Sequence, residues 1–192
     1  SNGNSSLGFV APNEWFDKFS RDNSLAMKQM LKKLEFYKAR FDDESFLFEP
    51  QKIENISKNV TELYGEGFVL TGNSAEFLDP IFSSGVSFAT ASGLLAAKLV
   101  LRQFRNEEVD WEKDYVTYLK KGIDVFSTYV KEWYSGNLQK IIFHPAPRPE
   151  IKAQICAVLA GYVWDESNPF VKKHKRIVKN VSKLIEMEEN KP

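Results

Sequence analysis

The most informative stretch of the sequence is Gly67-Phe68-Val69-Leu70-Thr71-Gly72-Asn73-Ser74-Ala75-Glu76-Phe77-Leu78-Asp79-Pro80-Ile81-Phe82-Ser83-Ser84-Gly85-Val86. Its apolar run from Phe68 to Leu70 is typical of a buried strand, and Gly72-Asn73 is typical of a turn. Asp79-Pro80 follows in a loop, and Gly85 opens a long apolar segment that is typical of a helix. The pattern therefore predicts a strand, a turn, a stiff loop and a glycine-headed helix, in this order.

Several residues of this stretch suit ligand binding. Gly72 lets the backbone approach a ligand closely because it has no side chain, and Asn73 offers a donor and an acceptor to a sugar or ribitol hydroxyl. Pro80 stiffens the loop. The N–H groups of Gly85 and Val86 would lie at the positive end of the helix dipole and stabilise an electron-rich group, such as the N1–C2=O edge of a reduced flavin. On these residues alone, an ordinary strand–turn–helix unit explains the pattern equally well.

The part of the chain before this stretch has a mixed pattern. Ser5–Val10 is typical of a strand, and Asn2-Gly3 before it is the preferred dipeptide of a two-residue hairpin turn. A hairpin turn needs a strand on each side, so we favour a chain that was cut within a sheet. Helices are predicted after Pro12 and after Asp22, which is a good N-cap. Ile53–Val60 alternates loosely and is compatible with either a strand or a helix.

The part after this stretch is predicted to be helical almost to its end. The fold class is therefore α+β, with a few strands that are part of a truncated sheet, followed by a predominantly helical C-terminal half. We expect residues 1–80 to form a partial substrate- and flavin-binding sheet region and residues 81–192 to form a helical region. The predicted helices are Gly85–Phe104, Trp111–Tyr134, Pro149–Ala160 and Pro169–Glu188.

Charge and hydropathy narrow the class of partner. Lysine plus arginine and aspartate plus glutamate number 26 each, so the net charge is zero. A balanced charge gives no general attraction to nucleic acid or to anionic membranes. Ile81–Val100 is long enough to span a bilayer, but Lys98, several serines and two glycines favour a helix of a soluble protein that is buried on most sides. We therefore expect neither a nucleic-acid partner nor a membrane partner.

The numbers of cysteines and histidines argue against disulfides and metal sites. The single cysteine, Cys156, excludes an internal disulfide and a multi-thiolate cluster, and two histidines far apart in sequence do not indicate a metal site. His144 is interpreted as a surface-loop residue, and the run from Lys172 to Arg176 around His174 as the solvated basic face of an amphipathic helix. The chain begins without the pattern of a signal peptide, which together with the single cysteine favours a cytoplasmic protein.

The stretch from Gly67 to Ala97 resembles the second flavin-binding motif of FAD-dependent monooxygenases and halogenases. In those families a strand ends in Gly-Asp, and an Asp-Pro loop and a glycine-headed helix follow beside the isoalloxazine ring. The match is most similar to the pattern Gly-(Asp/Asn)-x-x-x-Phe-x-Asp-Pro-x-x-Ser-x-Gly of halogenase-like oxidoreductases. Weaker similarity extends from Ser5–Val10 to Gly161-Tyr162-Val163-Trp164-Asp165, so the resemblance covers most of the chain.

The resemblance assigns roles to individual residues. Asn73 takes the position of an aspartate that contacts the ribitol, and we expect the amide to weaken this contact without removing it. Phe82 stands where tryptophan halogenases carry a glutamate, which argues against that tryptophan-specific mechanism. No catalytic residue is predicted. With Asp79, Pro80 and Gly85 at the reactive edge of the flavin, the predicted cofactor-binding residues are Gly72, Asn73, Asp79, Pro80, Gly85 and Val86.

One motif of the family is absent from this sequence. The sequence contains no Gly-x-Gly-x-x-Gly, because Gly65 and Gly67 are followed by Leu70 where the third glycine should stand. In the family this ADP-binding fingerprint, like the halogenase lysine, lies near the start of the full enzyme. We therefore expect a C-terminal portion that lacks the N-terminal FAD-binding half, that binds FAD weakly or not at all, and that is inactive alone.

The resemblance implies an FAD-dependent oxidoreductase of the halogenase or monooxygenase type that acts on a small organic substrate. In such an enzyme reduced FAD reacts with O2 to hydroxylate the substrate or to oxidise a halide. A dehydrogenase or reductase that uses the same flavin site is equally compatible. The alternative from another class is a non-catalytic helical interaction module that retains the fold, which the replacement of Asp by Asn73 favours.

Overall fold

The computed structural model describes residues 3–37, 40–41, 45–146 and 148–190. The chain divides into two compact units, Ser1–Ile56 and Ser57–Pro192, each of which is described by itself. A functional boundary after residue 80 would fall inside the second unit, and it stays a prediction.

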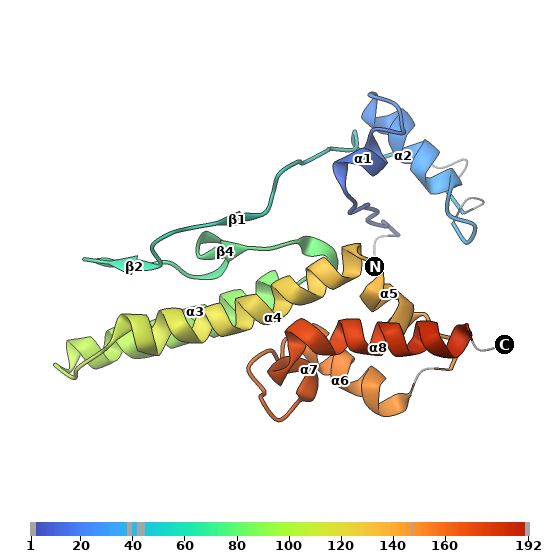
Figure 1. Ribbon diagram of the computed structural model, residues 1–192. Coiled ribbons are helices and arrows are strands. Elements are labelled where there is room, and N and C mark those ends of the chain that lie inside the picture. The colour runs from blue at the N-terminus through green and yellow to red at the C-terminus, as the bar shows by residue number, and fades with distance from the viewer. Residues whose placement is uncertain (1–2, 38–39, 42–44, 147, 191–192) are drawn as a thin grey trace. The chain divides into compact units, whose positions relative to one another are not determined.

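The first unit contains two helices, α1 (Asn13–Phe16) and α2 (Asn23–Lys32) (Figure 1). Asp22 caps α2 as predicted, because its Oδ1 accepts a hydrogen bond of 2.7 Å from the Leu25 N–H. The predicted strand at Ser5–Val10 was wrong, since these residues are irregular and no strand of the described chain pairs with them. Of the predicted Asn2-Gly3 turn, Asn2 lies outside the described residues.

The strands of the second unit are short. β1 (Lys58–Asn59) pairs antiparallel with β4 (Glu76–Phe77), and β2 (Tyr64–Gly65) pairs antiparallel with β3 (Phe68–Val69). In the ambiguous segment 53–60 the structure has the two-residue strand β1 and no helix. A few strands followed by a helical half confirm the predicted α+β class.

Helices make up most of the second unit (Figure 1). The longest, α3, has the predicted bounds. The predicted helix at Pro169–Glu188 is two helices, because the chain bends at Lys173, and the short helix α5 was not predicted. The helices are α3 (Gly85–Phe104), the π-helical turn η3 (Glu112–Val116), α4 (Thr117–Tyr134), α5 (Asn137–Ile142), α6 (Pro149–Leu159), α7 (Pro169–Lys172) and α8 (His174–Glu189).

The core of this unit consists of two clusters of buried side chains. One surrounds Phe126 and Tyr129 of α4 and brings together α3, α5, α6, α7 and α8. The other surrounds Tyr115 and Leu119 and packs the β2–β3 hairpin against α3. Trp164 packs against both clusters, and its indole N–H donates a 2.8 Å hydrogen bond to the carbonyl of Tyr118.

Two buried hydroxyl groups fix the end of the β2–β3 hairpin against the helices. Ser92 of α3 accepts a 2.8 Å hydrogen bond from the Gly72 N–H, and its own hydroxyl donates to the carbonyl of Phe88 at 2.6 Å. Tyr115, which is 0% exposed, donates a 2.6 Å hydrogen bond to the carbonyl of Leu70. Buried backbone groups need such partners, so these two bonds set where the strand ends relative to α3.

We predict that Ser92→Ala lowers the free energy of unfolding by about 1–3 kcal/mol, because the Gly72 N–H then lies buried without an acceptor. The matched control is Thr90→Ala on the same helix, since the exposed Thr90 hydroxyl bonds only within α3, to the carbonyl of Val86. Urea denaturation measures both losses. Equal losses for the two variants would contradict the proposed importance of the Ser92 bond.

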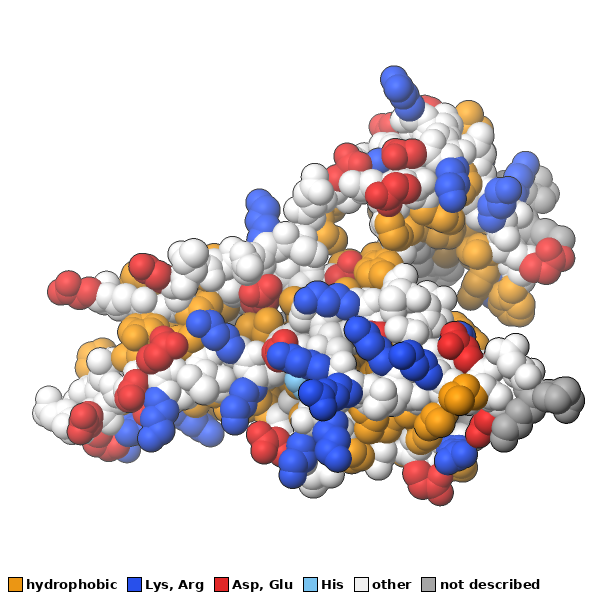
Figure 2. All heavy atoms as spheres, viewed as in Figure 1, with side chains coloured by type: hydrophobic (Ala, Val, Ile, Leu, Met, Phe, Trp, Pro, Cys, Tyr) orange, Lys and Arg blue, Asp and Glu red, His pale blue; other side chains and the backbone are white. Residues whose placement is uncertain are grey.

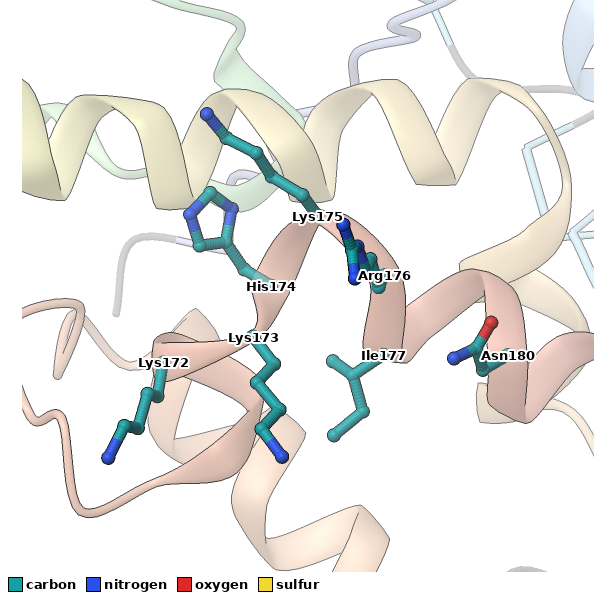
Figure 3. Close-up of a pocket in the computed structure, with 7 residues that line it drawn as sticks. All are labelled: Lys172, Lys173, His174, Lys175, Arg176, Ile177 and Asn180. Carbon is teal, nitrogen blue, oxygen red and sulfur yellow. The ribbon is translucent and has the colours of Figure 1, made fainter.

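His174 at the start of α8 is turned into the protein, although it lies in a basic run. Its side chain is 13% exposed, with Nδ1 2.8 Å from the Thr128 hydroxyl and Nε2 3.6 Å from the Asp124 carboxylate. Figure 3 shows the His174 ring and Lys175 directed toward α4, while Lys172 and Lys173 point away from it. The exposed Lys and Arg side chains gather over α7 and the start of α8 (Figure 2), as expected of a solvated basic face.

Burial lowers the pKa of His174; the Asp124 carboxylate opposes this shift, and the charge of Lys175, itself 2.7 Å from Asp124, adds to it. A histidine whose folded-state pKa lies below its unfolded value of about 6.5 contributes stability that is present above this pH and is lost as the pH falls. We predict that His174→Asn removes this part of the pH dependence. Thermal melts between neutral and mildly acidic pH should show a smaller loss of stability in the variant. A parallel decline of both proteins would contradict this assignment.

Candidate flavin-edge site

The predicted site residues lie on or next to three elements of the second unit that are close together in sequence. The turn η1 (Gly72–Ser74) follows the hairpin, the turn η2 (Pro80–Phe82) follows β4, and α3 begins three residues after η2. The local sequence explains this path. Gly72 adopts a positive φ of 57°, Pro80 opens η2 with its fixed φ, and Ser83 at φ 52° redirects the chain into α3.

Gly72 is buried and faces α3. A Cβ atom added to it would lie 3.1 Å from the Cβ of Ala89, so the absence of a side chain lets the strand end pack against the helix. Its N–H is also occupied by the Ser92 hydroxyl. The structure thus gives Gly72 a packing role, and its approach to a ligand stays a prediction.

Asn73 and Gly85 lie next to each other. A Cβ atom added to Gly85 would lie 3.2 Å from the side-chain oxygen of Asn73, which is tighter than an ordinary contact. Asn73 is itself exposed. The turn therefore presents the amide beside the first residue of α3, and the glycine makes room for it.

The start of α3 carries no local anion. No side chain caps the helix at Ser84, and the first turn contains no acidic residue. Val86 is 78% exposed. The N–H groups at the head of a 20-residue helix have a partial positive charge, and together with the exposed position they suit a negatively charged or electron-rich ligand.

The Asp79-Pro80 loop is fixed through the carboxylate of Asp79. Oδ1 accepts a 2.9 Å hydrogen bond from the Ile81 N–H, and Oδ2 accepts a 3.0 Å hydrogen bond from the hydroxyl of Tyr134, at the end of α4. Burial, the hydrogen bond to Asp79 and the charge of Asp79 together raise the pKa of Tyr134 to about 12. The phenol thus stays protonated and donates to Asp79 throughout the neutral range.

Sequence reasoning missed Ser92 and Tyr134. Both lie within long helices, where a hydroxyl gives no sign of a partner far away in sequence. Trp133 packs edge-on against Phe82, with the ring centroids 5.5 Å apart, and Trp164 packs against the core. Phe82 thus occupies its position as an apolar packing residue.

We predict that Tyr134→Phe lowers the free energy of unfolding by about 0.5–1.5 kcal/mol, because the Asp79 carboxylate loses a donor. Tyr118→Phe is the matched control: Tyr118 and Tyr134 are both 38% exposed, and within the described residues the Tyr118 hydroxyl has no hydrogen-bond partner. Denaturation in urea compares the two variants. If Tyr118→Phe costs as much as Tyr134→Phe, the bond to Asp79 does not stabilise the loop.

Comparison with known proteins gives halogenases among the relatives of this chain. No protein-family model matches the chain. A 1H-pyrrole-2-carbonyl-[peptidyl-carrier protein] brominase of Pseudoalteromonas luteoviolacea is 24% identical over 174 residues, which are 83% of this chain and 39% of the brominase. The chlorinase of the same substrate from Pseudomonas fluorescens is 31% identical over 118 residues, which are 59% of this chain and 25% of the chlorinase.

Two solved structures share the fold. A flavoprotein/dehydrogenase from Cytophaga hutchinsonii is 48% identical, with a TM-score of 0.94 over 99% of this chain and 47% of that chain. The flavin-dependent brominase Bmp2 is 20% identical, with a TM-score of 0.68 over 92% of this chain and 44% of that chain, and it shows the fold alone. The chain therefore spans less than half the length of these relatives.

The relatives agree with the resemblance that the Gly67–Ala97 stretch carries. Over most of its length the chain is similar to a flavoprotein/dehydrogenase and to halogenases.

Proposed function

We propose that this chain is the C-terminal, flavin-edge and substrate-side portion of an FAD-dependent oxidoreductase that acts on a small organic substrate. The observation that carries the proposal is the uncapped start of α3 beside the exposed Asn73 amide. The similarity of the chain to a flavin-dependent brominase and to a flavoprotein/dehydrogenase supports a flavin as the ligand.

The residues present fit a flavin. An exposed amide suits a ribitol hydroxyl, and the N–H groups of Gly85 and Val86 suit the electron-rich edge of the ring. Asp79 keeps the Pro80 loop beside them through its bonds to Ile81 and Tyr134. When bound, reduced FAD would supply the electrons that activate O2 for hydroxylation of the substrate or for oxidation of a halide, or it would exchange electrons with a substrate as in a dehydrogenase.

The ADP portion of the cofactor needs a second partner, an N-terminal FAD-binding half. α3 carries a row of exposed residues at helical spacing, and its ends are the most open: Val86 is 78% and Phe104 80% exposed. α3 is also long and apolar enough to span a membrane, but helices in the core of soluble proteins can have the same length and composition. We infer that the FAD-binding half covers this face, which consists of Val86, Thr90, Leu94, Ala97, Leu101 and Phe104.

The substrates of two relatives indicate the class of substrate for this chain. The brominase and the chlorinase act on a pyrrole-2-carbonyl group carried by a peptidyl-carrier protein. For this chain we propose a small organic substrate, without deciding between halogenation, hydroxylation and dehydrogenation. A non-catalytic helical interaction module is the second candidate, because Asn73 replaces the aspartate of the family motif.

We predict that the chain alone binds FAD weakly or not at all, and that the longest natural polypeptide containing it binds FAD and turns yellow. In that polypeptide Asn73→Ala should weaken FAD binding by about fivefold, which corresponds to one hydrogen bond of about 1 kcal/mol. Flavin fluorescence titration measures the affinity, independently of activity.

Ser74→Ala is the control for this variant, since Ser74 is the exposed neighbour and its hydroxyl donates to the carbonyl of Thr71. If both variants weaken FAD binding equally, the Asn73 side chain does not contact the flavin. If the natural polypeptide stays colourless under saturating FAD, the proposal of an oxidoreductase is wrong, and the non-catalytic interaction module becomes the better-supported function.

A further inference from the structure

A second site lies among the C-terminal helices, apart from the flavin-edge residues. α5, α6 and α8 lie together (Figure 1) and enclose a groove of about 220 Å³. Ile155, which is 2% exposed, and Ile141 belong to its lining, and Leu159, Val181 and Ile185 add half-buried apolar surface. None of the predicted flavin-site residues contributes to the lining.

The charged side chains in the lining of the groove are mostly basic. They are Arg148 and Lys152, while Glu188 is the one acidic side chain among the described lining residues, and His144 also belongs to the lining. The Arg148 guanidinium lies 3.6 Å from the Glu188 carboxylate, so these two charges balance each other. Lys152 is exposed, and within the described residues it forms no ion pair.

We propose that this groove binds an amphipathic organic anion, with an acyl chain or a single ring among the isoleucines and a carboxylate at Lys152. Burial of apolar ligand surface favours binding, and concave, mostly apolar sites with a few polar groups at one end are typical of small-molecule sites. The unpaired cation selects an anion over a neutral ligand, since the charge of Lys152 attracts a carboxylate and gives no such attraction to an uncharged head group. The volume suits a short acyl chain or a substituted ring and excludes a whole flavin.

Cys156 provides a reporter for the site. It is the only cysteine of the chain, it is exposed, and it lies in the lining of the groove. A ligand in the groove therefore covers the thiol and slows its reaction with a maleimide, without any label being introduced.

The experiment uses the whole chain and titrates octanoate and octanol as probes. We expect octanoate to slow the modification of Cys156 in a saturable way and to bind more tightly than octanol. Lys152→Gln should weaken octanoate binding severalfold and leave octanol binding unchanged, whereas Lys183→Gln, an exposed lysine of α8 outside the lining, should change neither. Isothermal titration calorimetry gives both affinities.

Three results would overturn the proposal. The first is that octanoate gives no protection of Cys156 up to its solubility limit. The second is protection that Lys152→Gln leaves intact, which would show a merely apolar surface. Protection that rises with protein concentration, accompanied by a dimer in size-exclusion chromatography, would assign the groove to a second copy of the chain and also overturn the small-ligand site. None of these outcomes depends on FAD, so this proposal and the proposed function fail separately.

Discussion

The arrangement of the second unit depends on the hydrogen bonds that Ser92 and Tyr115 make to the end of the β2–β3 hairpin. Both hydroxyls are in the interior, where an unpaired backbone group is costly, and each satisfies a group of the chain segment that leaves the hairpin. The hairpin has only two residues in each strand, which is too little to hold its own position. Its place is therefore set by the helices.

The hydrogen bond from Gly72 to Ser92 also fixes the position of the candidate site. Asn73 follows Gly72 in the same turn, so the Ser92 bond that holds Gly72 also sets where the amide of Asn73 lies relative to Gly85. From the other side, Tyr134 of α4 holds Asp79, four residues before Ser83 redirects the chain into α3. The turns that lead into α3 are thus held by α3 itself and by α4, and the site can be preorganised although its backbone consists of turns.

The parts that the sequence could predict are those with local causes. The bounds of α3 follow from a glycine and a long apolar run, and the cap at Asp22 follows from a side chain that bonds three residues ahead. The Ser5–Val10 segment has a strand-like composition, but a strand exists only with a partner, and the sequence does not show partners. Ser92 and Tyr134 were missed for the same reason, because their hydrogen-bond partners Gly72 and Asp79 lie 20 and 55 residues away.

The exchange of a carboxylate for the amide of Asn73 has an electrostatic consequence beyond the ribitol contact. The side-chain oxygen of Asn73 lies close to Gly85, at the positive end of the α3 dipole. An aspartate there would compensate the partial charge of the helix N-terminus, whereas a neutral amide leaves this charge available. The replacement that we expect to weaken the ribitol contact therefore strengthens the attraction of the helix for an electron-rich ligand. Asn73 is for this reason compatible with a working flavin site and does not by itself indicate a lost one.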